Sequence, residues 1–284
     1  MYALQKGESL LKFDRSNYVL TSVDYGSVSA THSTAKGVGQ VGEKVVNTTL
    51  DTRAVEIIGF IKASGKEDMK EKKAALLQMC DPREAFLVLP DADTALECWA
   101  TDTVKFASSK LINNERVAQF VIDAVCHDPL FRDAVARFQV ITEWASRFEW
   151  PLEIPSTGFY FAQRSPSLIA TLDNGGDVET GLLIHFTAGA TVENPVLTDI
   201  ETGEFIKLNH TFAAGETVVV NTNYGQESVT SYLGEEVKDV INDFDLASSF
   251  IQAPPGETRL HFSAGSNIDS MTVTIYYFNR FLGV

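Results

Sequence analysis

Only one segment of this 284-residue chain has the apolar spacing of an amphipathic helix, and short strand-like runs fill most of the remainder. The helical pattern covers about residues 66–80, where Met69, Leu76 and Met79 share one face. Asp81-Pro82 ends the pattern, because proline cannot continue a helix. A chain with so little helical periodicity is expected to adopt a mainly β fold.

In the first half, runs rich in Val, Ile and Thr predict strands around this helix. The predicted strands are 18–32, 44–63, 85–89, 95–100, 103–107 and 116–126. Ser64, three residues before Glu67, has the spacing of a capping box that would begin the helix. Between the first two strands, residues 33–43 are small and glycine-rich, which predicts a loop or an extended arm.

In the second half, short apolar runs alternate with turn sequences such as Asn174-Gly175 and Pro254-Pro255-Gly256, a pattern that predicts an antiparallel β-sandwich. One helical interval is expected near 234–247. A segment rich in aromatic residues and proline separates the two patterns. We therefore expect a β domain with one helix at 1–145 and a sandwich at 146–284.

The charge of the chain excludes one large class of partners. The net charge is −15, and residues 151–284 carry 17 acidic but only 5 basic side chains. Binding to nucleic acid or to an anionic membrane needs the opposite sign, so neither is expected. The N-terminus has no hydrophobic segment of the secretory type, and no run is long enough to span a membrane, so a soluble protein without a signal peptide is expected.

The cysteines and histidines do not have the spacing of catalytic or metal sites. Cys80, Cys98 and Cys126 are odd in number and lie in apolar segments, so we expect three buried thiols and no disulfide framework. The histidines form no metal-binding motif. Acidic side chains at Asp173, Asp177 and Glu179 are better explained by turn chemistry than by calcium.

Two glycine-containing segments imitate phosphate-binding motifs. Residues 37–42 match GxGxxG, but the flanking sequence does not supply the required strand and helix, so a loop is expected. Residues 59–67 have the wrong spacing for a phosphate loop and carry Glu67 where a hydroxyl is needed. No nucleophile elbow is present, and the acidic pairs are explained by a solvated face. We therefore expect no enzymatic activity, no cofactor and no metal.

The order of several segments resembles a known family. These segments are AVEIIGFIKA, LLQMCDPREAFLVLPD and FVIDAVCHDPLFRD in the first half, followed by AAGETVVVNTNYGQESV, PPGETRLHFSAG and VTIYYFNRFLGV. Together they resemble the distal tail proteins of long-tailed siphophages and prophages of Gram-positive bacteria. The resemblance covers nearly the whole chain.

This resemblance implies a ring-forming N-terminal β domain and a C-terminal galectin-like or carbohydrate-module-like sandwich. It implies a structural protein of the virion tail tip, or baseplate, that is made in the bacterial cytoplasm. The implied partners are other copies in a homo-hexameric ring, the major tail tube protein, the tail-tip fibre or tail-associated lysin, receptor-binding proteins and the tape measure protein.

Two sets of residues are candidates for contacts. Lys36, Gly37, Gly39, Gly42 and Glu43 belong to the glycine-rich loop, which we expect to be mobile alone and ordered against a neighbouring subunit or the tail tube. An ordinary exposed hairpin loop is the competing interpretation. The alternative function is a carbohydrate- or receptor-binding module. Because Trp99, Trp144 and Trp150 all precede most of the sandwich, its weak glycan contacts would come from Tyr224, Tyr232 or Tyr160.

Overall fold

The computed structural model describes residues 2–141, 144–146, 162–164 and 168–283. Contacts divide the chain into two units, residues 1–134 with 281–284 and residues 135–280. The second unit is therefore inserted into the sequence of the first. The predicted boundary between residues 145 and 146 falls next to a segment outside the described residues and stays a prediction.

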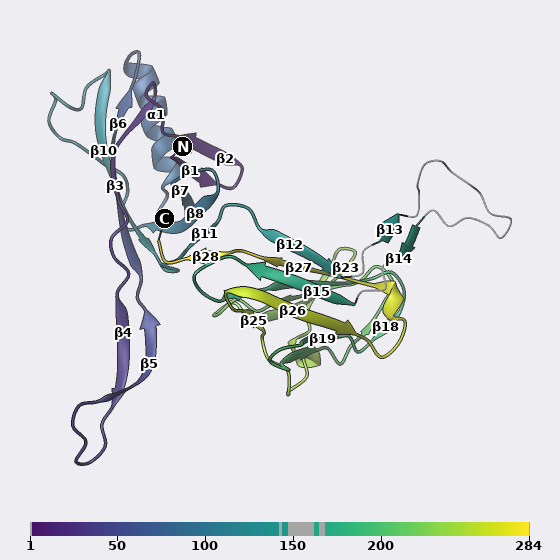
Figure 1. Ribbon diagram of the computed structural model, residues 1–284. Coiled ribbons are helices and arrows are strands. Elements are labelled where there is room, and N and C mark those ends of the chain that lie inside the picture. Colours follow the sequence, from purple (N-terminus) through teal and green to yellow (C-terminus); the bar gives the residue numbers. More distant parts are fainter. Residues whose placement is uncertain (1, 142–143, 147–161, 165–167, 284) are drawn as a thin grey trace. The chain divides into compact units, whose positions relative to one another are not determined.

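The first unit is a sheet with one helix against it (Figure 1). Its elements are β1 (Ala3–Lys6), β2 (Ser9–Lys12), β3 (Tyr18–Asp24), β4 (Ala30–Ala35), β5 (Lys44–Leu50), β6 (Arg53–Lys62), α1 (Lys66–Met79), β7 (Phe86–Leu89), β8 (Thr94–Ala100), β9 (Lys105–Phe106), β10 (Val117–Cys126) and β11 (Phe131–Asp133). The sheet order is β2-β1-β7-β8-β10-β6-β3. β28 (Arg280–Phe281) spans the return of the chain from the second unit to the first.

The central strands β6 and β10 form the longest antiparallel pair of this unit, from Arg53 opposite Cys126 to Lys62 opposite Val117. Side chains alternate between buried and less buried along both strands, as expected for a sheet with one face on the core. Gly59 is required there, because a Cβ at this position would lie 2.5 Å from Phe120 Cζ.

Helix α1 matches the predicted helix within one residue and buries Met69, Leu76 and Met79 as expected. The predicted capping box is wrong. Gly65 is the N-cap, and both the backbone N–H and the hydroxyl of Ser64 donate to Asp68 Oδ2, at 2.7 and 3.0 Å. Asp68 lies one residue beyond the expected Glu67, and its negative charge in the first turn also favours the helix dipole.

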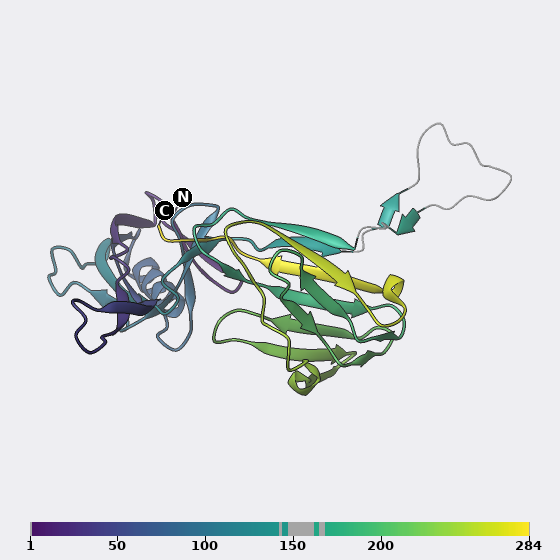
Figure 2. The same cartoon turned by 60° about the horizontal axis from the view of Figure 1, so that its bottom comes forward.

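The second unit is an antiparallel sandwich (Figure 2). Its elements are β12 (Arg137–Ile141), β13 (Trp144–Ser146), β14 (Ala162–Arg164), β15 (Ile169–Asn174), β16 (Thr180–Gly181), β17 (Leu183–Ala188), β18 (Val192–Glu193), β19 (Val196–Asp199), β20 (Phe205–Lys207), β21 (Thr211–Phe212), β22 (Thr217–Asn221), β23 (Ser228–Leu233), β24 (Glu236–Asp239), β25 (Gln252–Ala253), β26 (Gly256–Ser263) and β27 (Met271–Tyr277), with 3₁₀ turns at Ile241–Asp243 and Ile268–Ser270.

One sheet has the order β12-β27-β17-β22-β23-β24 and the other β15-β26-β19-β20, and both sheets contribute to one apolar core. The mainly β fold class is confirmed. The helical interval expected near 234–247 is wrong, because β24 pairs with β23 and the rest of this interval contains one 3₁₀ turn, Ile241–Asp243.

Candidate functional site

Strands β4 and β5 form a two-stranded sheet of their own, which we call the arm (Figure 1). Every residue from 29 to 52 is exposed, so neither face of the arm packs on the core. Local polar contacts support it, including Thr31 with Asp51 and His32 with Thr48. An isolated two-stranded ribbon is marginally stable in water, so an arm of this kind gains most from a partner.

The tip of the arm, residues 36–43, contains all of the predicted interface residues. The Gly37 N–H donates to Gln40 Oε1 at 2.9 Å, and Gly39 and Gly42 both have a φ of +77°, which favours glycine. Val38 and Val41 are fully exposed at this tip. The expected loop over 33–43 is too long, because residues 33–35 belong to β4.

Glu43 has a partner within its own arm, since the Thr34 hydroxyl donates to Glu43 Oε2 at 2.6 Å. The exposed apolar side chains of the arm continue from the tip along β5, at Val45, Val46 and Leu50. Exposed apolar side chains gathered on one element are typical of a protein contact surface. A role of Lys36, Gly37, Gly39, Gly42 and Glu43 in such a contact stays a prediction.

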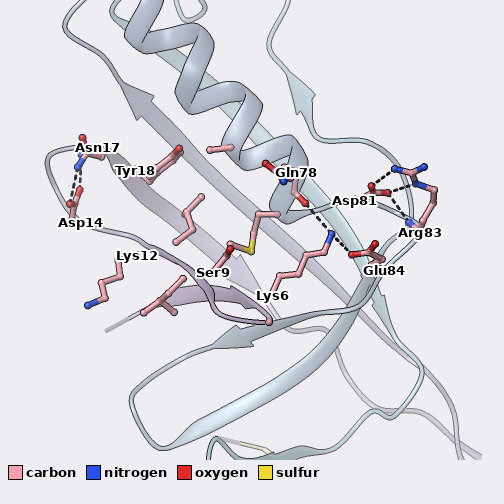
Figure 3. Close-up of a pocket in the computed structure, with 15 residues that line it drawn as sticks. Lys6, Ser9, Lys12, Asp14, Asn17, Tyr18, Gln78, Asp81, Arg83 and Glu84 are labelled. Atoms are coloured by element: carbon pink, nitrogen blue, oxygen red, sulfur yellow. Dashed lines mark hydrogen bonds and ion pairs between the residues drawn. The ribbon is translucent and has the colours of Figure 1, made fainter.

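A groove of about 970 Å³ lies between the β1–β2 hairpin and α1 (Figure 3). Four of its charged groups form two ion pairs. Lys6 Nζ lies 2.8 Å from Glu84 and donates to the Gln78 carbonyl, and Arg83 binds Asp81 through two donors. This pairing is typical of a structural surface rather than of a catalytic centre.

Strand β2 forms one wall of this groove and is an edge of the sheet. Leu11 pairs with Leu4, and the Phe13 N–H donates to the Tyr2 carbonyl, so the alternating backbone groups of Leu10 and Lys12 face away from β1. An open edge of this kind can accept an extended segment of another chain. The groove is therefore a second candidate surface for a protein partner.

The tyrosines predicted as weak glycan contacts are not brought together. Tyr224 lies beyond the Asn221–Ser228 pair at one end of the β22–β23 hairpin, whereas Tyr232 pairs with Thr217 at the other end. The four-residue offset along β23 corresponds to about 13 Å. Tyr224 is exposed and donates to Glu179 Oε1 at 3.2 Å, and burial followed by the charge of Glu179 raises its pKa. Tyr160, Trp144 and Trp150 lie outside the part of the chain whose side chains are described.

The sequence reasoning missed a polar cluster around His210 in the sandwich. His210 Nδ1 lies 2.7 Å from Asp243 Oδ2, and His210 Nε2 lies 2.8 Å from Glu216 Oε1. Ser231 and the Ala213 N–H also donate to Glu216. Burial would raise the pKa of Glu216, but these hydrogen bonds outweigh it, so the pKa is lowered. Through these contacts the cluster links the 3₁₀ turn Ile241–Asp243 to Ser231 of β23. No local sequence motif could have indicated the cluster.

Among the described residues, no three His, Cys, Asp or Glu side chains are grouped as metal ligands would be. Within the same residues, no helix has the length and hydrophobicity needed to cross a membrane.

Comparison with known proteins finds a family model that matches most of the second unit. Residues 175–281 match the family model of the siphovirus-type tail component, C-terminal domain. A search of curated protein sequences finds no match.

Solved structures extend the likeness to the whole chain. The Dit protein (gp 19.1) of SPP1, described as a paradigm of the hub adsorption apparatus in phages infecting Gram-positive bacteria, has a TM-score of 0.66 at 12% identity and covers 99% of both chains. The activated baseplate of phage P2 with Ca matches with a TM-score of 0.58 at 8% identity, covering 98% of this chain and 97% of that one. The same baseplate with Sr gives 0.57 at 8% identity.

The fold of the whole chain is thus that of Dit, and the family model independently identifies the sandwich. Residues 175–281 thus match the C-terminal domain of siphovirus-type tail components, and the predicted resemblance of the chain to the distal tail proteins of siphophages is confirmed.

Proposed function

We propose that the chain is a non-enzymatic hub protein of a phage tail tip. It assembles as a ring of six copies between the tail tube and the tip fibre, and it is made in the host cytoplasm. Its neighbours are the tail tube protein, the tail-tip fibre or tail-associated lysin, receptor-binding proteins and the tape measure protein. Support comes from the Dit-like fold of the whole chain and from the family match of the sandwich.

The observation that carries the proposal is the arm. Its residues are exposed on both faces, and its tip presents Val38 and Val41 to solvent. Such an element contributes little to the core of its own unit, so its value lies in contact with another chain. In this assignment Lys36, Gly37, Gly39, Gly42 and Glu43 touch a neighbouring subunit or the tail tube.

Replacing residues 36–42 by a short Gly-Ser turn tests this role. The melting temperature of the monomer should change little, because the tip contacts no core residue. Ring formation in negative-stain images, and incorporation at the tail tip detected by immunogold labelling, should both be lost.

A second test changes both valines of the tip, in the double variant Val38→Asp/Val41→Asp. Its matched control is Leu111→Asp. Leu111 is also highly exposed in the first unit but lies outside the arm. The double variant should fail to assemble while Leu111→Asp assembles normally. Normal incorporation of the variant without its tip would refute the bridging role, and a strict monomer that never labels the tail tip would refute the hub function.

The carbohydrate-binding alternative stays a prediction. A glycan array on the intact chain tests it. Saturable binding that disappears in Tyr224→Ala or Tyr232→Ala would favour this alternative. The separation of the two tyrosines argues against a shared stacking surface.

A further inference from the structure

Cys98 and Cys126 face each other in the core of the first unit, from the adjacent strands β8 and β10. Both are buried, and their Sγ atoms are 2.7 Å apart. A disulfide bond has a length of about 2.05 Å, so the two sulfurs need to approach by only about 0.7 Å. The third thiol, Cys80, is also buried, at the end of α1.

The strand register places the two cysteines directly opposite one another. Ala100 pairs with Ala124 and Trp99 with Val125, so Cys98 and Cys126 form the next pair along the ladder. The Thr101 N–H donates to the Asp123 carbonyl. Because hydrogen-bonded and non-hydrogen-bonded pairs alternate, Cys98 and Cys126 occupy a non-hydrogen-bonded pair.

This type of pair has the backbone separation that a disulfide needs. Its Cα atoms lie about 4.5 Å apart, inside the range of about 4.4–6.8 Å found in disulfides. The cross-link therefore fits the observed backbone without moving either strand to a new register.

The surroundings of the pair favour the thiol form of Cys98, and they also contain a cation, Arg53. The contact with Cys126 and burial both raise the pKa of Cys98, so its thiol form is favoured. Arg53 lies directly opposite Cys126 on β6 and is itself buried. Its described polar contact is the Leu282 carbonyl at 2.7 Å, and its Nε has no hydrogen-bond partner. The pair is therefore bordered by the buried guanidinium of Arg53.

We propose that Cys98 and Cys126 form an intrachain disulfide when the protein meets a small-molecule disulfide oxidant. Two protein thiols lose two protons and two electrons to form one S–S bond, and one molecule of oxidised glutathione accepts them to become two molecules of reduced glutathione. The proposal depends only on the geometry of the first unit and does not rest on the hub function.

The test begins with the intact chain, purified in reductant and then incubated or refolded with oxidised glutathione. Free thiols counted in denaturant should fall from three to one, and the mass should fall by the two hydrogen atoms lost. A non-reducing peptide map should join the peptides of Cys98 and Cys126. The melting temperature of the first unit should rise by about 5–10 °C, because the cross-link closes a loop of 28 residues.

Cys80→Ser is the matched control, because it removes an equally buried thiol and should leave the cross-link and the thermal shift intact. Cys98→Ser and Cys126→Ser should abolish both. The peptide map of the wild-type chain decides the question even if these variants fold poorly. Three free thiols after refolding with the oxidant, or a bond that joins Cys80, would overturn the proposal.

Discussion

Glu216 shows how a single buried charge contributes to the sandwich. Its carboxylate accepts hydrogen bonds from Ser231 and the Ala213 N–H and faces His210, and the pKa is lowered although burial acts in the opposite direction. A folded-state pKa below the unfolded value means that the charged form stabilises the folded state above about pH 4.5, its ordinary value. This contribution is lost as the pH falls through the folded-state pKa.

Glu216→Gln should therefore destabilise the second unit by about 2 kcal/mol at pH 7, because hydrogen bonds to a charged acceptor are removed. The variant should also lose less stability than the wild type between pH 5 and pH 3. Calorimetric unfolding across this range measures both effects. Glu201→Gln is the control, since Glu201 forms a half-exposed pair with Arg259, and its cost should stay within about 0.5 kcal/mol. An unchanged melting temperature of Glu216→Gln at pH 7 would contradict the assignment.

At this scale the sequence predicts burial better than proximity. The prediction that all three cysteines pack in the core is confirmed, because apolar flanks indicate burial directly. The contact between Cys98 and Cys126 depends on the register of β8 against β10, which no local spacing encodes. The same holds for His210 and Asp243, which are 33 residues apart.

Among the elements, α1 and the arm differ in what supports them. Helix α1 buries one face against β1, β2 and β6, and its apolar spacing predicts it from sequence almost to the residue. The arm has no such face. Its strand β4 (ATHSTA) is exposed at every position, so no alternation marks it, and the sequence predicts its last residues as loop.

Two neighbouring leucines test which face of α1 is buried. Leu76→Ala should destabilise the first unit by about 2–5 kcal/mol, because Leu76 is fully buried and its loss leaves a cavity. Leu77→Ala should cost less than about 1 kcal/mol, because the Leu77 side chain is 39% exposed. It is a matched control, because both substitutions change the helix propensity by the same amount. Urea unfolding followed by circular dichroism gives both values. Equal costs would contradict the orientation of the helix.

For the molecule as a whole, each unit has a separate apolar core. The sequence predicts two β-rich domains from their composition. It does not predict that residues 281–284 return to the first unit, because four residues carry no pattern of their own. Phe281 packs against the first core, and the Leu282 carbonyl accepts a hydrogen bond from Arg53, so this short return stabilises the first unit.

Separate fragments test this division. Residues 135–280 alone should unfold cooperatively, at a temperature close to one of the two transitions of the full chain. Residues 1–134 joined by a Gly-Ser linker to 281–284 should melt several degrees above residues 1–134 alone, since only the joined form keeps Phe281 and the carbonyl partner of Arg53. Differential scanning calorimetry makes the comparison. Identical melting of the two first-unit fragments would show that the return is dispensable.

The strands at which the chain enters and leaves the second unit are neighbours. β12 follows the entry, β27 precedes the exit, and Arg137 pairs with Tyr277 across them. The inserted unit therefore begins and ends at nearly the same place. Recombination with breakpoints on either side of residues 135–280 could replace the entire sandwich with any domain whose two ends are adjacent, while the first unit keeps its sheet order β2-β1-β7-β8-β10-β6-β3.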